Sequence, residues 1–386
     1  MSLETYLKNK PIFYKKIDYE RMPRAFNSIK DKIILKPIIH IVGTNGKGST
    51  GRFLTLLIES LGLKVGHYTS PHIFKFNERF YKNGDIVSDD ELNIAHDKLQ
   101  NLLSDEFKNS LSYFEYATLL AAILFKDCDY WVFEAGMGAE FDATNCFDKS
   151  LSLFTPIGLD HMEILGGSIE KISHTKLISM AKTAILNDDI NEISVKIAKD
   201  IALQKGSNLS FASQNLSNLE KTEIKNYIKK HALANFQISN LSLALAGAKA
   251  LNLNPDLKNL KKLNLKGRLE RVDKNLLVDV GHNELAAQNL LKELKDQKFT
   301  LIYNAFLDKD YKSVLKTLKP IIKEVQIYDY KSSYRELATP YIKKTCDDLG
   351  IKCFNFHSLK KDENYLLFGS FMLVEEFCEH LHKYNW

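Results

Sequence analysis

Short apolar runs alternate along the chain with longer stretches in which apolar residues recur every three or four positions. The runs typical of strands are Pro37–Val42, Val65–Tyr68, Tyr130–Phe133, Leu151–Ile157, Leu276–Val280, Phe299–Tyr303, Val325–Tyr328 and Tyr365–Phe368. Helical patterns cover Lys47–Leu61 and Asn235–Leu251. A capping box at Ser88-Asp89-Asp90-Glu91 opens a further helix through Leu103. Because strands alternate with helices, the pattern predicts βαβ units and a largely parallel sheet.

The pattern breaks near residue 254. The segment Asn252-Leu253-Asn254-Pro255-Asp256 is rich in residues that interrupt helices and strands. Since 386 residues exceed what one hydrophobic core usually fills, we place a domain boundary there. The predicted fold class is α/β, with a P-loop-type N-terminal domain over residues 1–256 that has a mostly parallel central sheet. A smaller, Rossmann-like α/β domain is predicted over residues 257–386.

Composition narrows the class of protein. Hydrophobic residues make up 45% and charged residues 26% of the chain, as in ordinary soluble globular proteins. The formal charge of +5 is spread over many lysines without a basic block, so it favours anionic small molecules over nucleic acid. Five cysteines without metal-ligand spacing indicate reduced thiols in a cytoplasmic protein. The longest apolar run, Tyr116–Phe125, is too short to cross a bilayer, so no membrane partner is expected.

Glycines are concentrated directly after the first predicted strand, in Gly43-Thr44-Asn45-Gly46-Lys47-Gly48-Ser49-Thr50. Such a turn exposes consecutive backbone N–H groups at the start of a helix, while Lys47 adds a cation and Ser49 or Thr50 a hydroxyl. These groups predict a nucleotide site. The spacing departs from the common G-x-x-x-x-G-K-[ST] loop, because only three residues separate Gly43 from Lys47. A glycine-rich turn without a ligand is the alternative interpretation.

Polar side chains follow three further predicted strands, at the ends where ligands bind in open α/β sheets. Ser70, Glu134 and His161 each come shortly after such a strand. A hydroxyl, a carboxylate and an imidazole beside bound phosphates would suit Mg²⁺. Taken singly, Ser70 is also explained as a turn residue before a proline, Glu134 as a helix cap and His161 as a core histidine.

A larger set of motifs runs in order through nearly the whole chain. The motifs are Lys16-Ile17-Asp18, Gly43–Thr50, Thr69-Ser70-Pro71-His72, Asn77-Glu78-Arg79, Tyr113-Phe114-Glu115, Asp142-Ala143-Thr144-Asn145, Gly158-Leu159-Asp160-His161, Gln237 with Asn240, Gly267-Arg268-Leu269-Glu270, Asp279-Val280-Gly281-His282-Asn283, Asp308-Lys309-Asp310 and Phe368-Gly369-Ser370-Phe371. Together they resemble the folylpolyglutamate synthase/dihydrofolate synthase family, which belongs to the Mur-ligase-like, ATP-dependent amide ligases.

The resemblance implies residues for ATP, metal and catalysis. The residues implied for ATP are Thr44, Asn45, Gly46, Lys47, Gly48, Ser49, Asn240, Arg268 and Asp279. The residues implied for Mg²⁺ are Ser70, Glu134 and His161, and those implied for catalysis are Lys47, Lys176 and His282. Lys176 matches a family lysine that is carbamylated and so becomes an anionic partner of the metal. Its place on a predicted helix, without the resemblance, would indicate an ordinary solvated lysine.

The resemblance also implies a pocket for the pterin-containing substrate. Its residues are Asp18, Phe114, Glu115, Phe141, Asp142 and Ala143. Two segments depart from the family pattern: Gly138-Ala139-Glu140 replaces Gly-Gly-Arg, and Phe236 stands where a histidine normally precedes Gln237. The first change reverses a charge near the pocket. Neither change removes a proposed phosphate or metal group.

The implied reaction joins L-glutamate to a carboxylate through an acyl phosphate, in folate biosynthesis and polyglutamylation. The acceptor is the benzoate carboxyl of dihydropteroate, the γ-carboxyl of a (tetrahydro)folate, or both. Expected partners are therefore these acceptors, L-glutamate, ATP and Mg²⁺, and the chain is expected to act as a monomer.

Two alternative functions stay open at this point. A Mur-type ligase that acts on a muramyl nucleotide would share the phosphate loop and the metal residues. A non-catalytic nucleotide switch would share the loop alone. A GTPase would need a guanine-reading Asn-Lys-x-Asp sequence, which Asp308-Lys309-Asp310 does not supply.

Overall fold

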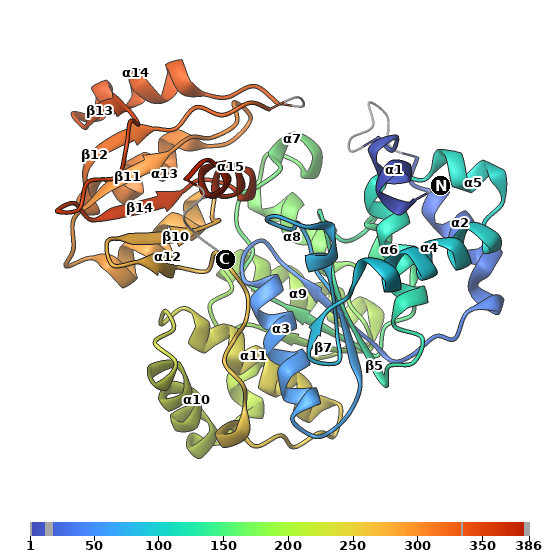
Figure 1. Ribbon diagram of the computed structural model, residues 1–386. Helices are drawn as coiled ribbons and strands as arrows, with labels where there is room; N and C mark the ends of the chain where they lie inside the picture. Colours follow the sequence, from blue (N-terminus) through green and yellow to red (C-terminus); the bar gives the residue numbers. More distant parts are fainter. Residues whose placement is uncertain (1, 12–17, 333–334, 382–386) are drawn as a thin grey trace. The chain divides into compact units, whose positions relative to one another are not determined.

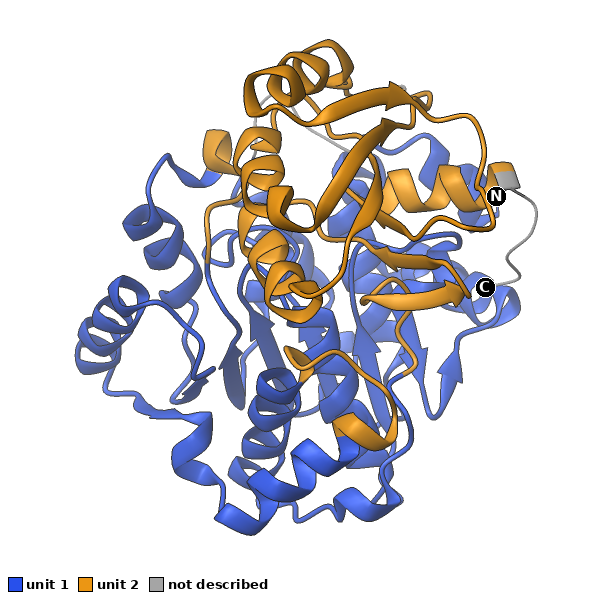
Figure 2. Ribbon diagram, turned by 90° about the vertical axis from the view of Figure 1, so that its left-hand side faces the viewer, with its two compact units in different colours: residues 1–157, 165–227, 238–263 blue, residues 158–164, 228–237, 264–386 orange. Residues whose placement is uncertain are grey.

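The computed structural model describes residues 2–11, 18–332 and 335–381, and the chain divides into two compact units. Figure 2 shows unit 1, residues 1–157, 165–227 and 238–263, in blue, and unit 2, residues 158–164, 228–237 and 264–386, in orange. Lys16 and Ile17 of the first motif lie outside the described residues. The last segment of unit 2 begins at Asn264, a few residues beyond the predicted boundary near Asp256. The roles assigned to the two domains stay a prediction.

Among the described residues, unit 1 forms an eight-stranded sheet in the order β4-β3-β2-β5-β1-β6-β7-β8. The strands are β1 Ile38–Val42, β2 Val65–Tyr68, β3 Phe80–Lys82, β4 Asp85–Ile86, β5 Tyr130–Glu134, β6 Leu151–Phe154, β7 Thr183–Leu186 and β8 Asn208–Phe211. Neighbours from β2 to β8 pair in parallel, whereas β3 and β4 run antiparallel at one edge. The predicted, mostly parallel central sheet is therefore confirmed.

The central strands follow from the sequence pattern. Every residue of β1 is buried, as expected for a parallel strand that is covered on both faces. Predicted strands coincide with β2 and, to within one residue, with β1 and β5. The predicted strand Leu151–Ile157 is too long, because β6 ends at Phe154. Beyond it the chain turns, and the Pro156 carbonyl accepts N–H groups of the glycine-rich loop.

Helices surround this sheet (Figure 1). Up to residue 250 they are α1 Leu3–Lys8, α2 Arg21–Ile29, α3 Lys47–Glu59, α4 Asp89–Leu102, α5 Asp105–Ser110, α6 Tyr113–Leu124, α8 Ile169–Leu177, α9 Glu192–Lys205, α10 Asn218–Lys230 and α11 Gln237–Ala250. The short helix α7 Met162–Leu165 belongs to unit 2 except for its last residue. The predicted capping box is confirmed at the start of α4, where Ser88 accepts the Glu91 N–H and Glu91 accepts the Ser88 N–H. Helix α3 packs against β1, β2 and β5 and ends two residues before the predicted Leu61.

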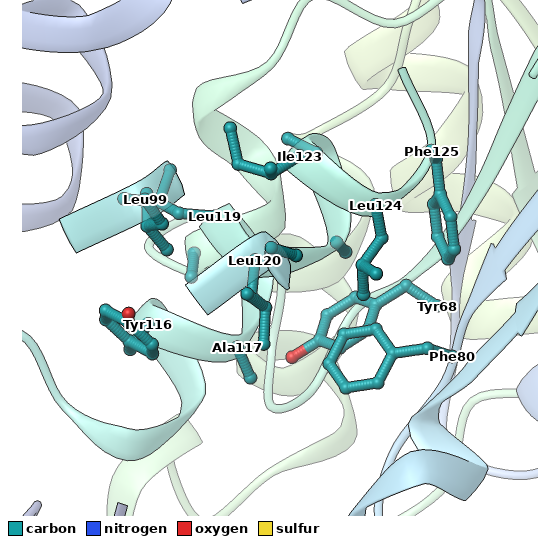
Figure 3. Close-up of a cluster of buried hydrophobic side chains, with 14 of the residues drawn as sticks. Tyr68, Phe80, Leu99, Tyr116, Ala117, Leu119, Leu120, Ile123, Leu124 and Phe125 are labelled. Carbon is teal, nitrogen blue, oxygen red and sulfur yellow. The ribbon is translucent and has the colours of Figure 1, made fainter. Parts of the chain in front are cut away.

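Helix α6 contributes much of the apolar core on one side of unit 1 (Figure 3). Its residues Leu119, Leu120 and Ile123 belong to a cluster that also contains Leu99 of α4 and Tyr68 of β2. Since every residue from Tyr116 to Leu124 is buried, the longest apolar run of the sequence is a core helix. Throughout the described residues, no helix has the length and apolar character that a membrane span requires.

The described part of unit 2 forms a six-stranded sheet in the order β13-β12-β11-β14-β10-β9. Its strands are β9 Glu270–Asp273, β10 Leu276–Asp279, β11 Phe299–Tyr303, β12 Ile322–Ile327, β13 Lys352–Asn355 and β14 Tyr365–Phe368. Its helices after residue 264 are α12 Glu284–Leu294, α13 Tyr311–Leu318, α14 Thr339–Leu349 and α15 Phe371–Leu381. The strands pair in parallel except for β9, which runs antiparallel to β10. The predicted second α/β unit is confirmed, and β12 begins a few residues before the predicted Val325.

Candidate active site

Four neighbouring strands of unit 1, in the order β2-β5-β1-β6, end at the same edge of the sheet. Ligands of open α/β sheets bind at the carboxyl ends of such strands. Glu134 is the last residue of β5, and the segments that follow the other three strands contain Ser70, the glycine-rich loop of residues 43–46, and Pro156. Three of the predicted groups are therefore brought to one edge of unit 1.

The glycine-rich loop closes on the start of α3. Gly46 caps this helix with a φ of 88°, a left-handed conformation that favours glycine, and a side chain there would collide with Asn240. Asn240 also accepts a hydrogen bond from the Thr50 hydroxyl at 3.4 Å. The N–H groups of Thr44 and Asn45 donate to the Pro156 carbonyl, at 2.9 and 3.4 Å. The implied ATP residues of unit 1 thus form one connected structure, in which Gly48 and Ser49 occupy the first turn of α3.

Glu134, the last residue of β5, is 4% exposed and lies beside this loop. The Thr69 hydroxyl donates to its carboxylate, the Ser70 N–H donates to it at 3.4 Å, and the Lys47 ammonium lies 3.8 Å away. Lys47 also donates to the Thr44 carbonyl at 3.2 Å. Glu134 is therefore no helix cap. The Ser70 hydroxyl and the Glu134 carboxylate supply the hard oxygen ligands that Mg²⁺ prefers.

Thr69 was not predicted as a functional residue, although its hydroxyl stands in the same motif as Ser70. Its contact with Glu134 orients the carboxylate. Within the described ranges, no group of three or more His, Cys, Asp or Glu side chains could hold a metal by itself. A metal at Glu134 would consequently depend on hydroxyl and phosphate oxygens as well.

Glu78 holds the loop that carries Ser70. Its carboxylate accepts three consecutive backbone N–H groups at 2.8 to 3.0 Å, from Ile73, Phe74 and Lys75. The next residue, Arg79, donates through Nε to Nδ1 of His72 at 2.8 Å. Burial and the Arg79 charge lower the pKa of His72 to about 3, so its ring accepts this bond in the neutral form. The Asn77-Glu78-Arg79 motif therefore orders the loop after β2.

Lys176 lies on α8, is 5% exposed and donates through Nζ to the Gly43 carbonyl at 2.9 Å. The expectation from its helical position alone, a solvated lysine, is wrong. The preceding residue, Thr175, accepts the Glu140 N–H at 2.9 Å. Helix α8 therefore contacts both the phosphate loop and the loop that follows β5.

Two residues implied for the acceptor pocket, Phe114 and Asp142, contact Gly136. A side-chain carbon on Gly136 would come within 2.7 Å of the Phe114 ring, so this ring lies against the backbone. Asp142 accepts the N–H groups of Gly136 and Met137, each at 3.0 Å. Ala143, the next residue, is buried.

Phe141 and Tyr19 form an exposed aromatic pair. Phe141 is 57% and Tyr19 47% exposed, and their ring centroids are 4.2 Å apart. Asp18 itself accepts the Glu20 N–H at 3.0 Å and lies 3.4 Å from the Arg24 guanidinium. Its neighbour Tyr19, which was not predicted, therefore makes the contact with Phe141.

Glu115 is engaged in the fold. Its carboxylate accepts the Ser112 N–H at 2.7 Å, which completes a capping box at the start of α6. The same carboxylate lies 2.8 Å from the Arg21 guanidinium. These contacts join α2 to α6, so within the described residues Glu115 orders the helix that presents Phe114.

In unit 2, the Asp160 carboxylate lies close to the side chains of Lys309, His282 and His161. The carboxylate lies 2.5 Å from Lys309 Nζ, 3.4 Å from His282 Nε2 and 3.7 Å from His161 Nε2. Burial alone would raise the pKa of Asp160, but the hydrogen bond from His282 and the charges of His282, His161 and Lys309 hold it well below its usual range. The His161 side chain is 37% exposed and is therefore no core histidine.

Arg268 and Asp279, both implied for ATP, lie close together in unit 2. The Asp279 carboxylate accepts the Leu269 N–H at 2.8 Å and the Gly281 N–H at 2.7 Å. Burial raises the pKa of Asp279, against these amides and the Arg268 charge. The Arg268 guanidinium lies 5.3 Å from the centre of the Phe371 ring and donates to the Gly267 carbonyl at 3.2 Å.

Comparison with known proteins identifies the family. The Mur ligase middle domain matches residues 41–252, which include the phosphate loop, Glu134 and Lys176. A dihydrofolate synthase/folylpolyglutamate synthase of Buchnera aphidicola subsp. Schizaphis graminum is 30% identical, over 87% of this chain and 86% of its own length. The crystal structure of Helicobacter pylori folylpolyglutamate synthetase is 41% identical, with a TM-score of 0.80 over 99% of this chain and 98% of that chain.

A more distant structure agrees in fold. It is a bifunctional folylpolyglutamate synthase/dihydrofolate synthase with Mn, AMPPNP and L-glutamate bound, 24% identical, with a TM-score of 0.80 over 98% of this chain and 97% of that chain. The matches to the Buchnera and Helicobacter proteins extend over most of both chains. This chain therefore belongs to the Mur ligase family and, within it, to the dihydrofolate synthase/folylpolyglutamate synthases.

Proposed function

We propose that this chain uses ATP to add L-glutamate both to dihydropteroate and to the γ-carboxyl of (tetrahydro)folates. The observation that carries the proposal is the buried Glu134 carboxylate, held by Thr69, Ser70 and Lys47 beside an anion-binding loop. A carboxylate in that place would repel a triphosphate unless a divalent cation lies between them. A nucleotide loop together with a metal-binding carboxylate supports phosphoryl transfer rather than nucleotide binding alone.

The residues proposed to hold Mg²⁺ are Ser70, Glu134 and His161. The donor set fits, because hydroxyl and carboxylate oxygens are ligands of this ion. When bound, Mg²⁺ supplies charge neutralisation for phosphoryl transfer. The bifunctional relative binds Mn and AMPPNP, in agreement with a metal–nucleotide site in this family.

The reaction starts with a carboxylate, which is inert toward amines at neutral pH. An acceptor oxygen attacks the γ-phosphorus of ATP, the bond to ADP breaks, and an acyl phosphate forms. Lys47 and the backbone amides of Gly46, Lys47 and Gly48, at the start of α3, would hold the transferred group in line. The amino group of glutamate then attacks the acyl carbon, loses a proton, and displaces phosphate. The products are an amide, ADP and phosphate.

Lys176 and His282 are proposed as further catalytic residues. An uncharged Lys176 amine would react with CO₂ to give a carbamate, which converts a cation into an anion near the Gly43 carbonyl. This anion would assist the metal and orient the acceptor carboxylate. His282 is proposed as a catalytic residue whose ring is oriented by the Asp160 carboxylate, 3.4 Å from its Nε2.

The acceptor pocket is proposed at Phe114, Phe141, Asp142 and Ala143. Tyr19 joins Phe141 in presenting exposed aromatic faces, which suit a planar pterin ring. Asp18 and Glu115 would act by ordering the segments that carry Tyr19 and Phe114. Arg268, Asp279 and Asn240 complete the proposed ATP contacts. The chain is further proposed to act as a monomer in the cytoplasm, without nucleic acid or membrane partners.

The proposal is tested with purified protein, ATP, Mg²⁺ and L-glutamate. Dihydropteroate, tetrahydrofolate and a UDP-muramyl acceptor are offered in separate tubes, and glutamate addition is scored by mass spectrometry. Glutamylated dihydropteroate and tetrahydrofolate are expected, with no product from the muramyl acceptor. Product from one pterin acceptor alone would restrict the activity to that acceptor. Product from the muramyl acceptor alone would overturn the proposal.

A further inference from the structure

His40 is a buried imidazole in the middle of β1 with no place in the proposed reaction. It is 0% exposed, and its Nε2 lies 2.8 Å from the Thr144 hydroxyl. Its Nδ1 is buried and has no hydrogen-bond partner among the described residues. Burial and the nearby Lys149 charge lower the pKa of His40 to about 3. The ring is therefore neutral at physiological pH and carries one N–H.

The neighbouring bond decides where that proton lies. The Thr144 hydroxyl is 2.6 Å from Oδ1 of Asp142, so its single proton goes to the carboxylate. The hydroxyl oxygen can then only accept from His40. His40 is consequently the Nε2–H tautomer, and the donors run in one direction from β1 through Thr144 to Asp142.

Asp142 connects this chain of hydrogen bonds to the loop after β5. Besides the two bonds from Thr144, its carboxylate accepts the N–H groups of Gly136 and Met137 at 3.0 Å. Burial raises the pKa of Asp142, but the four donors occupy the acceptor positions of both oxygens and so favour the ionised carboxylate. On its other side, Gly136 lies against the Phe114 ring. Residues 135–141 are thus held between the Asp142 carboxylate and an aromatic ring, directly after Glu134.

We infer that His40, Thr144 and Asp142 form a positioning relay that fixes residues 135–141 relative to the phosphate loop. The inference rests on the proposed function, because these residues lead from Glu134 to the proposed acceptor residues. His40 lies on the strand that ends in the phosphate loop, and Asp142 binds the loop of the adjacent strand β5. The relay touches no reacting atom. It sets where the acceptor lies relative to the nucleotide.

A pair of Thr144 variants tests the relay. Thr144→Val keeps the shape and removes the hydroxyl, whereas Thr144→Ser keeps the hydroxyl. Thr144→Val is expected to raise the acceptor KM about tenfold and to change the ATP KM less than about twofold, since misplacement is confined to the acceptor side. Thr144→Ser is expected to restore the wild-type acceptor KM. Equal acceptor KM values in the two variants would overturn the relay.

Two measurements do not depend on turnover and so separate this inference from the proposed function. Hydrogen exchange of residues 135–141, followed by mass spectrometry, should be at least about tenfold faster in Thr144→Val than in Thr144→Ser. Nitrogen-15 spectra of histidine-labelled protein should show His40 as the neutral Nε2–H tautomer. Unchanged exchange in Thr144→Val, or the Nδ1–H tautomer, would reject the relay even in an active enzyme. An enzyme that adds no glutamate but shows both signatures would reject only the proposed function.

Discussion

The Lys176 ammonium donates to the carbonyl oxygen of Gly43 at 2.9 Å, so one buried side chain joins α8 to the phosphate loop. Lys176→Ala should lower the rate of glutamate addition by about two orders of magnitude or more, because the charged carbamate proposed on Lys176, beside the phosphate loop, is lost. Formate or acetate should restore part of the activity by occupying the vacant anion position. Intact-protein mass spectrometry of the wild type should show the added carboxyl. Lys171→Ala, on an exposed position of the same helix, is the control. A fully active Lys176→Ala enzyme with an unmodified wild-type lysine would reject carbamylation.

Glu134→Gln keeps the size of the side chain but removes its charge. We expect about a hundredfold loss of turnover with little change in melting temperature, and partial recovery at high Mg²⁺. Initial rates measured over a range of Mg²⁺ concentrations decide this. Glu192→Gln, on an exposed helix position, should behave as wild type. Normal turnover in a folded Glu134→Gln protein would remove Glu134 from the metal site.

Glu78→Gln replaces the carboxylate that accepts three backbone N–H groups by an uncharged amide. Hydrogen bonds to an ionised acceptor contribute more than neutral ones, so unit 1 should lose about 2 kcal/mol of stability. The Mg²⁺ concentration for half-maximal rate should also rise, because the loop carries Ser70. Glu91→Gln changes a comparable capping carboxylate on α4 and should leave the Mg²⁺ dependence unchanged. The same Mg²⁺ dependence in both variants would make Glu78 a structural residue only.

Arg268→Ala should raise the ATP KM about tenfold and lower kcat, because a cation beside Asp279 is lost. The Phe371 ring would also lose its guanidinium partner. Steady-state kinetics, measured together with a melting curve, distinguish a role in ATP binding from a purely structural role. Arg271→Ala, on the exposed side of β9, is the matched control. A lower melting temperature with unchanged kinetics would show that Arg268 only supports unit 2.

The pH dependence of stability should report the buried histidine on β1. The pKa of His40 falls from 6.5 to about 3 on folding, so between these values the unfolded chain binds one more proton than the folded chain. Stability therefore falls as pH drops below 6.5, with about 1.4 kcal/mol per pH unit from this group. His67 and His72, whose pKa values are also lowered, add to the slope. In urea unfolding at pH 4 to 7, His40→Gln should show a shallower slope; an unchanged slope would mean that His40 titrates normally.

Local patterns carried most of the successful predictions. The glycine-rich loop, the capping box at Ser88 and the central strands are each encoded within a few consecutive residues. The strands missed by the pattern include β8 and β13, short edge strands that are partly exposed. Such strands carry polar residues and lack an apolar run. Edge strands are therefore hard to predict from hydrophobic periodicity.

The site depends more on contacts between distant segments. Lys176 follows the buried Ile172 by four residues, so helical spacing held a signal for its burial. Glu115 was assigned to the substrate by motif, whereas its capping box with Ser112 was readable from the sequence. The His40 and Thr144 pair joins residues 104 positions apart. Nothing in either local pattern predicts that contact, because it depends on the order of strands in the sheet.

That strand order has a consequence for how the protein is made. Both partners of β1 in the sheet, β5 at Tyr130–Glu134 and β6 at Leu151–Phe154, emerge from the ribosome long after Ile38–Val42. Until then this strand, which is wholly buried in the folded protein, has no parallel neighbour, and non-local pairing of this kind is slow and prone to aggregation. The phosphate loop also donates hydrogen bonds to the carbonyl of Pro156, which follows β6. A nascent chain should therefore acquire ATP binding only after β6 has been synthesised, and early arrest would leave a fragment that needs chaperone protection.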